Sequence, residues 1–465
     1  MKKRLLLLHV PYGELYGGKV NLRKAGLGLP PIGVASLSAY VREKTACHVK
    51  VIDMLFHGVS IADLSTVLSD FKPDIVGLSA TTPQMDNAYA VARAVKGHQP
   101  RIQTVIGGAH VTALPQRTLQ EETCVDFGIL GEGEIPLQSL IEEKPLDSIK
   151  SLVWRKGDDA IVVNERQPLI QDLSTLPFPD YAALPLDRYK TIYSGSAIGI
   201  MSSRGCKYNC SFCASHVISQ GYHRLRPIGM VLDDIERLLK LGVHGFAIFD
   251  DTFTASKERV YEFLDGYGRR NLKEPWSCET RVDCLDRKII RAMHRSGLNI
   301  LKIGVESGNQ KILDKVGKGI KLAQVRQVCE WCADEGITVY AYFILGLPYE
   351  TKETMRETIE FARNLPIDFA QFSMLMPLPG TRVWKMAEEG KVLRNLAKSW
   401  SDYDRYKKAI VELNGVSTDE ITKMHRQAAR SFYLRFSYIF KILKKIRNWN
   451  DLITYFRLGW TFLRA

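Results

Sequence analysis

Three cysteines in one short loop are the residues of this sequence best suited to chemistry. Cys206, Cys210 and Cys213 stand in a C-x3-C-x2-C arrangement. Iron–sulfur clusters normally take four cysteines, so three thiolates can hold a cluster in which one iron stays open for a substrate or cofactor. A structural zinc ion is the alternative, because His216 follows at a spacing that could complete a Cys3His tetrahedron. We favour the cluster, since the loop follows a predicted strand, where catalytic sites are built.

The remaining cysteines do not share this spacing. Cys329 and Cys332 form C-x-x-C, but they fall in a predicted amphipathic helix, where core packing is the better interpretation. No chemistry is assigned to Cys47, Cys124, Cys278 and Cys284. Nine cysteines used in this way do not resemble a secreted disulfide framework, so we expect a cytoplasmic protein.

The first part of the chain must position a ligand beside this loop. A chain of 465 residues is long enough for two or three domains. Apolar runs at 5–10, 49–52, 75–78, 104–106 and 127–130 alternate with amphipathic segments. This pattern predicts an α/β fold with a doubly wound, Rossmann-like parallel sheet, which binds ligands at the carboxyl ends of its strands.

A second α/β array follows the first. Its predicted strands are 198–202, 245–249, 276–280, 300–305, 339–345 and 370–375, and helical patterns separate them. Six βα units predict a partial (β/α)6 TIM barrel that is open on one side. The expected organisation is a ligand-binding domain at 1–145, a proline-punctuated linker at 146–195, the barrel at 196–400 and a helical extension at 401–465.

Further stretches complete a recognisable pattern. In the barrel they are 203–213, 249–251, 304–308 and 346–351, and in the first sheet 29–33, 77–82, 107–110 and 131–134. Over roughly residues 1–400 the chain resembles the cobalamin-binding subgroup of the radical S-adenosylmethionine (SAM) superfamily. The resemblance implies a [4Fe-4S] cluster on Cys206, Cys210 and Cys213, SAM on the open iron, and reductive cleavage of SAM to a 5′-deoxyadenosyl radical.

The resemblance also implies a SAM site. Its residues are Phe212, beside the adenine, with Asp250, Asp251, Arg281, Glu306, Gly346 and Glu350. Acids suit the ammonium and the ribose diol of SAM, and Arg281 could form a fork to its carboxylate. Alternatively, Glu306 and Glu350 are acids that the helix dipole favours at helix N-termini.

A cobalamin site is implied at the strand ends of the first sheet. Its residues are Ser79, Thr81, Gly107, Gly108, His110, Gly131, Glu132 and Gly133. Glycines let a bulky ligand approach the backbone, although ordinary βα turns would also use them. The Asp-x-His-x-x-Gly signature of many corrinoid proteins is absent, because His57 stands two positions late. We therefore expect cobalt without a protein histidine beneath it, and His110 is either near the ligand or a satisfied buried histidine.

The leading functional hypothesis is methylation of an unactivated carbon of a small molecule, with an electron donor such as flavodoxin or ferredoxin. Radical oxidative cyclisation or rearrangement without methyl transfer is the alternative, and a non-catalytic corrinoid or zinc-binding regulator is a remote one. A tRNA-modifying enzyme would use the same cysteine spacing. However, the sequence shows no appended small β-barrel, so a nucleic acid is not the expected partner.

The C-terminal segment 423–465 carries much of the net charge of +13, since it holds ten Lys or Arg and one acid, Asp451. Its aromatic residues are Phe432, Tyr433, Phe436, Tyr438, Phe440, Trp449, Tyr455, Phe456, Trp460 and Phe462. This mixture predicts a helical, peripheral membrane-docking element and a hydrophobic, lipid-like substrate. The alternative is a cap that packs its aromatic side chains against the open side of the barrel.

Overall fold

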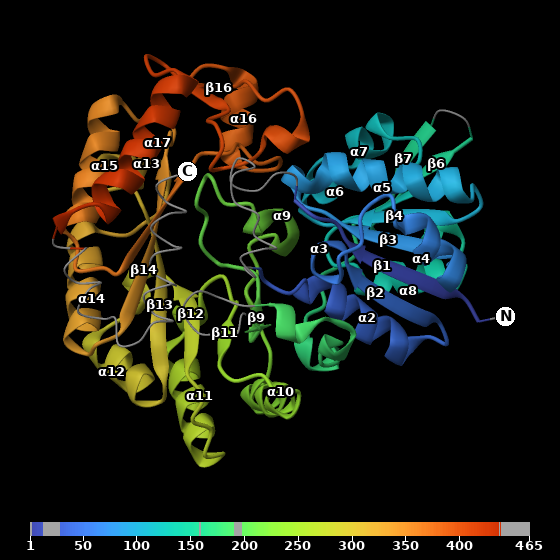
Figure 1. Cartoon of the computed structure of the whole chain (residues 1–465), viewed down its shortest axis with the longest axis horizontal. Helices are drawn as coiled ribbons and strands as arrows, with labels where there is room; N and C mark the ends of the chain where they lie inside the picture. The colour runs from blue at the N-terminus through green and yellow to red at the C-terminus, as the bar shows by residue number, and fades with distance from the viewer. Residues whose placement is uncertain (1, 13–27, 158–159, 190–197, 437, 439–465) are drawn as a thin grey trace.

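The computed structural model describes residues 2–12, 28–157, 160–189, 198–436 and 438. Two α/β bodies lie side by side, the first in blue to cyan and the second in green to orange (Figure 1). Among the described residues, no helix has the length and apolar character needed to cross a membrane.

The first body is built on a seven-stranded sheet in the order β2-β1-β3-β4-β5-β6-β7. Its strands are β1 (Arg4–His9), β2 (His48–Asp53), β3 (Ile75–Ser79), β4 (Gln103–Gly107), β5 (Phe127–Ile129), β6 (Leu152–Lys156) and β7 (Ala160–Val163). The first five are parallel, as the sequence predicts. Leu5, Leu6 and Leu8 are completely buried, which a strand covered on both faces requires.

Short helices connect these strands. They are α2 (Ile32–Lys44), α3 (Met54–His57), α4 (Leu64–Phe71), α5 (Met85–His98), α6 (Ala109–Ala113), α7 (Pro115–Glu121) and α8 (Glu134–Ile141). The strand order reverses between β1 and β3, and such a switch point creates a crevice at the carboxyl ends of the strands.

Part of the predicted linker extends the first sheet. β6 and β7 lie within 146–195 and pair antiparallel next to β5, because Leu152 and Val153 are buried against it. The following stretch forms the 3-10 turns η4 (Leu173–Thr175), η5 (Tyr181–Ala183) and η6 (Leu186–Arg188). Tyr189 is buried and donates a 2.9 Å hydrogen bond to Asp53 at the end of β2. The stretch therefore packs along the first body.

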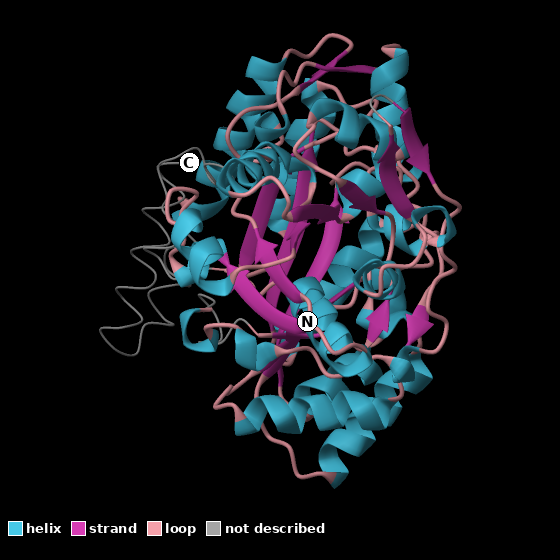
Figure 2. Ribbon diagram, turned by 90° about the vertical axis from the view of Figure 1, so that its right-hand side faces the viewer, coloured by secondary structure: helices cyan, strands magenta, loops and turns pink. Residues whose placement is uncertain are grey.

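The second body is a six-stranded parallel sheet in the order β15-β14-β13-β12-β11-β8. The strands are β8 (Gly199–Ile200), β11 (Phe246–Ile248), β12 (Trp276–Thr280), β13 (Leu298–Glu306), β14 (Thr338–Leu345) and β15 (Phe369–Met374). Among the described residues, β8 and β15 are its edges and do not pair, so the sheet is the open partial barrel that the sequence predicts. Figure 2 shows these strands as a twisted layer with helices around it.

The helices of the second body are α9 (Ser215–Ser219), α10 (Ile228–Lys240), α11 (Lys257–Arg269), α12 (Arg287–Arg295), α13 (Gln310–Lys315), α14 (Leu322–Asp334), α15 (Lys352–Asn364), α16 (Arg382–Glu389) and α17 (Thr418–Tyr433). Two small antiparallel sheets of two strands accompany them: β9 (Ser203–Arg204) with β10 (Arg224–Leu225), and β16 (Leu393–Asn395) with β17 (Val411–Leu413). Cys329 and Cys332 are completely buried in α14, as core packing requires.

The start of the C-terminal segment packs on the barrel. Ser417 caps α17, and Tyr433 near its end donates a 2.9 Å hydrogen bond to the carbonyl of Ala370 in β15. Phe432, Tyr433 and Tyr438 are buried, whereas Phe436 is 92% exposed. These three aromatic residues therefore serve as a packed cap, while the predicted membrane-docking residues from Phe440 onward lie outside the described residues.

Candidate active site

The three cysteines lie in the loop between β9 and α9. Their thiols are free and half-buried. Burial raises the pKa of Cys213 to about 12 and raises that of Cys210 as well. Buried thiolates therefore need a positive partner, which the irons of a cluster supply. A loop of three such thiols fits the predicted cluster.

His216 does not turn toward these thiols to complete a zinc site. Its Nε2 is hydrogen-bonded to the carbonyl of Tyr208, within the cysteine loop. His216 thus braces the loop, and its Nε2 already has a protein partner.

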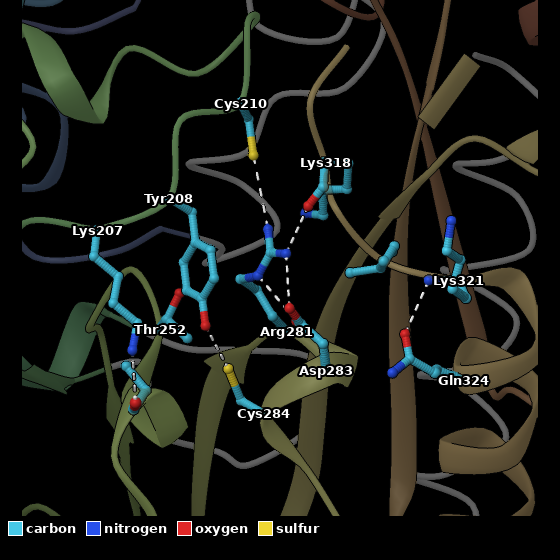
Figure 3. A network of polar contacts seen from close by, with 12 residues as sticks. Lys207, Tyr208, Cys210, Thr252, Arg281, Asp283, Cys284, Lys318, Lys321 and Gln324 are labelled. Carbon is cyan, nitrogen blue, oxygen red and sulfur yellow. Dashed lines mark hydrogen bonds and ion pairs between the residues drawn. The ribbon is translucent and has the colours of Figure 1, made fainter. Parts of the chain in front are cut away.

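Arg281 lies directly beside the cysteine loop (Figure 3). Its Nη1 donates to Cys210 Sγ at 3.8 Å, and its guanidinium carbon is 3.7 Å from the ring centroid of Tyr208. Asp283 accepts two hydrogen bonds of 3.0 Å from Nε and Nη2, and the carbonyl of Lys318 accepts a third of 2.6 Å. The fork that we predicted for the SAM carboxylate is thus filled by Asp283, and Nη1 faces Cys210, one of the predicted cluster ligands.

The two neighbouring aspartates after β11 are placed differently. Asp250 is buried and accepts hydrogen bonds from the backbone N–H groups of Ser202 and Ser203 at 2.7 and 3.0 Å. It therefore fixes the strand that leads into the cysteine loop. Asp251 is exposed and accepts a 2.7 Å hydrogen bond from Ser215 Oγ, just after Cys213.

The predicted acids at the ends of β13 and β14 have local partners. Glu306 forms a buried 2.7 Å ion pair with Lys318 and has a left-handed backbone, with φ 71°. Glu350 accepts hydrogen bonds from the N–H groups of Gly346 and Leu347 at 2.8 and 3.0 Å. Burial raises the pKa of Glu350 to about 8, although these two N–H groups oppose the shift. Glu350 and Gly346 together therefore close the loop after β14.

Phe212, between Cys210 and Cys213, is half-buried and packs against the main hydrophobic core. The structure thus brings Phe212 and Arg281 to the cysteine loop, and it arranges the four acids around that loop and the neighbouring strand ends.

A cavity of about 440 Å³ lies between the two bodies. From the first body it is lined by the ends of β3, β4 and β5 with the turns that follow, including Ser79, Gly107, Gly108, Gly131, Glu132 and Gly133. From the second it is lined by Ser203, Arg204 and Gly205, just before Cys206, and by Ala214 and Ser215, just after Cys213. The cavity therefore reaches from the crevice of the first sheet to the cysteine loop.

The glycines leave room for a bulky ligand. A Cβ added at Gly107 or Gly33 would meet no atom within 4 Å, so both positions present bare backbone to the cavity. Gly108 has φ 120°, and a Cβ there would lie 2.3 Å from the carbonyl oxygen of Ala80. The mostly apolar, glycine-lined wall fits a broad macrocycle such as cobalamin.

Two of the predicted cobalamin residues lie away from this wall. Thr81 donates to Gln84 Oε1 at 2.7 Å within a capping box. His110 is buried, its Nδ1 is 3.2 Å from Thr82 Oγ1, and its ring lies 4.4 Å from that of Trp400. Among the described residues that line the cavity there is no histidine, while His57 is hydrogen-bonded to the backbone of Asp53. The contact of His110 with Trp400, which lies in η9 (Trp400–Asp402), could not be predicted from any local sequence pattern.

Glu132 connects the two bodies. Arg224 donates to both of its oxygens at 2.9 and 3.0 Å, and Arg204 donates to Glu132 at 2.8 Å and to Glu134 at 2.6 Å. Burial alone would raise the pKa of Glu132, but the hydrogen bonds from Arg224 and Arg204 lower it. Sequence reasoning missed both arginines, because a single charged residue near a motif has no distinctive spacing.

The comparisons with known proteins agree with this geometry. The Radical SAM superfamily matches residues 200–362, and the B12 binding domain matches residues 18–141. An uncharacterized methyltransferase of Pyrococcus horikoshii is 34% identical over 442 residues, which is 94% of each chain. The chain belongs to the cobalamin-binding radical SAM family. This radical SAM enzyme therefore uses a [4Fe-4S] cluster, SAM and cobalamin.

Other relatives of this radical SAM enzyme differ in their reactions. The anaerobic magnesium-protoporphyrin IX monomethyl ester cyclase of Rubrivivax gelatinosus is 31% identical, over 81% of this chain and 68% of that protein. The methyltransferase TsrM from Kitasatospora setae, solved with cobalamin and a [4Fe-4S] cluster, has a TM-score of 0.70 at 16% identity, covering 93% of this chain and 89% of TsrM. OxsB, solved with aqua-cobalamin and SAM, has a TM-score of 0.75 at 19% identity, covering 99% and 71%. These two structures show the same fold.

Proposed function

We propose that this enzyme methylates an unactivated carbon atom of a small molecule. The observation that carries the proposal is the shared cavity, whose wall includes both the glycine-rich strand ends of the first sheet and the residues that flank Cys206 and Cys213. A methyl donor in the cavity and a radical formed at the cysteine loop would then act on one substrate. Several relatives are methyltransferases, including the one that is similar over nearly the whole chain.

In this proposal the three cysteines would hold the cluster, and the glycines at the ends of β4 and β5 would hold cobalamin. When bound, the cluster and SAM supply a radical that removes a hydrogen atom from the substrate, and cobalamin supplies the methyl group. Bound between the two bodies, both cofactors would be shielded from bulk water, which would protect the radical. An external one-electron donor, such as a flavodoxin or ferredoxin, would reduce the cluster.

A labelled methyl group tests the proposal. Anaerobically reconstituted enzyme is incubated with methyl-deuterated SAM, cobalamin, a reductant and the small-molecule filtrate of cells of the source organism, and products are followed by mass spectrometry. We expect one product that carries the deuterated methyl group, together with 5′-deoxyadenosine and S-adenosylhomocysteine. The variant with Cys206, Cys210 and Cys213 all changed to Ala should form neither the product nor 5′-deoxyadenosine. A substrate-dependent product without the label would instead establish cyclisation or rearrangement.

A further inference from the structure

One face of the second sheet carries polar side chains that the cofactor sites do not use. In β14, Val339, Ala341, Phe343 and Leu345 are buried in the core, and the alternating residues Thr338, Tyr340, Tyr342 and Ile344 are half-buried on the opposite face. The register continues this second face across the sheet, because Lys302 pairs with Glu279 on one side and with Tyr340 on the other. Gln371 of β15 follows beside Tyr342.

These side chains form one connected group. Lys302 Nζ lies 3.6 Å from Glu279 Oε1, and the Tyr342 hydroxyl donates to the same oxygen at 3.2 Å. Tyr340 donates to Gln371 at 2.5 Å, and the rings of Tyr340 and Tyr342 are 5.1 Å apart. Barrel interiors of this kind are usually filled with branched apolar residues. The Lys302–Glu279 pair is instead partly open to solvent, where an ion pair adds little stability, so it suits a binding role better than a stabilising one.

The group lies between the cofactor sites. The Lys302 ammonium is 5.6 Å from the ring centroid of Phe249, and Phe249 lines the interbody cavity. Glu279 stands two residues before Arg281, or about 7 Å along an extended chain, and Arg281 contacts Cys210. A molecule bound over Lys302 and Glu279 would therefore lie near both the cavity and the cysteine loop.

The pair is suited to exchange partners. Its 3.6 Å separation exceeds the 2.7–3.2 Å of a normal N–H···O hydrogen bond, and the Glu279 and Lys302 side chains remain 41% and 18% exposed. An ammonium takes a carboxylate, and a carboxylate takes an amine or hydroxyl donor. The Tyr342 hydroxyl acts on Glu279, so Tyr342 is a positioning residue.

We propose that Lys302 and Glu279 bind the substrate of this enzyme, and that the substrate is a small organic acid with a hydrogen-bond donor beside its carboxylate. Lys302 takes the carboxylate, and Glu279 takes the neighbouring amine or hydroxyl. This inference rests on the proposed methyl transfer and replaces the lipid-like substrate that the sequence suggested. A wholly hydrophobic molecule would leave both charges without a partner.

The test compares Lys302→Met and Glu279→Gln with the wild type and with Lys321→Met, a control lysine that is 65% exposed and pairs with Asp314. Two readouts are taken: transfer of the deuterated methyl group into the cell filtrate, and substrate-free cleavage of SAM to 5′-deoxyadenosine. Methyl transfer should fall at least tenfold in both site variants, and SAM cleavage should stay within twofold of the wild type.

Two further variants refine the test. Lys302→Arg keeps the charge, so it should retain more methyl transfer than Lys302→Met. Tyr342→Phe should lower methyl transfer less than Glu279→Gln does. The methyl-accepting fraction should stay in the aqueous phase against chloroform.

Each other outcome has a definite meaning. If the wild type transfers no methyl group to the filtrate, the proposed function fails and this inference falls with it. If the wild type is active and the site variants are equally active, only the inference is overturned. Loss of SAM cleavage in a variant that keeps its cluster absorption would assign the pair to SAM. An acceptor that partitions into chloroform would also overturn the inference.

Discussion

The two sheets of this enzyme carry different kinds of residues at the carboxyl ends of their strands. The first ends in glycines whose backbone borders an open cavity, and at Gly107 even a Cβ would meet no neighbour. The second ends in charged side chains that already have protein partners, such as Arg281 with Asp283 and Glu306 with Lys318. The first sheet thus offers shape to a large ligand, whereas the second holds its charges in fixed positions around the cysteine loop. The contrast indicates that size decides what binds on one side and electrostatics on the other.

The largest effect should come from breaking the ion pairs of Glu132, which connect the two bodies. Glu132→Gln leaves Arg224 buried without its charged partner, and loss of one member of such a pair typically costs about 3–5 kcal/mol. We expect a lower midpoint of thermal unfolding and weaker retention of cobalamin. Glu143→Gln is the matched control, because its ion pair with Lys3 is on the surface and should matter little. Equal stability of the two variants would show that the Glu132 pair does not hold the bodies together.

Filling the glycine-lined wall should affect only the first region. Gly107→Leu adds a side chain where the protein leaves open space, so the fold should tolerate it while the ligand should not. We expect cobalamin affinity to fall at least tenfold, or about 1.4 kcal/mol, with unchanged iron content. Gly97→Leu in α5 is the control, because a Cβ there also meets no neighbour. Unchanged cobalamin binding in Gly107→Leu would place the ligand elsewhere.

Removing the cation beside Cys210 should affect only the second region. In Arg281→Met the N–H that faces the sulfur is lost, so the oxidised cluster is stabilised relative to the reduced one, which carries more negative charge. We expect a reduction potential lower by about 59 mV for each 1.4 kcal/mol of lost interaction in a one-electron couple. Redox titration followed by paramagnetic resonance measures it, with Arg287→Met, which pairs with Asp334, as control. An unchanged potential would leave Arg281 with a purely structural role.

The sequence predicts the fold more completely than the site. All eleven predicted strands form, because buried parallel strands are marked by apolar runs. The cysteines were identified by their spacing and Gly107 by its motif, but the partners of Arg281 and Glu132 were not. Arg281 meets Asp283 within one turn and Cys210 across the barrel mouth, and only the second contact depends on tertiary structure. Lys302 and Glu279 likewise become neighbours only through strand register, which no local pattern reports.

The last effect is spread over several pH units and concerns Glu350, which closes the loop after β14. Burial raises the pKa of this carboxyl to about 8, so it is protonated in the folded enzyme at neutral pH, whereas the unfolded chain ionises it near its ordinary value of about 4.5. The stability that comes from the neutral form is complete below the unfolded pKa, and it declines as the pH rises through the folded pKa. Over this window the decline amounts to at most about 1.4 kcal/mol per pH unit, and Glu350→Gln, which cannot ionise, should lack it. Urea unfolding of both proteins from pH 5 to pH 9 measures the difference, and parallel curves would mean that Glu350 stays ionised in its loop.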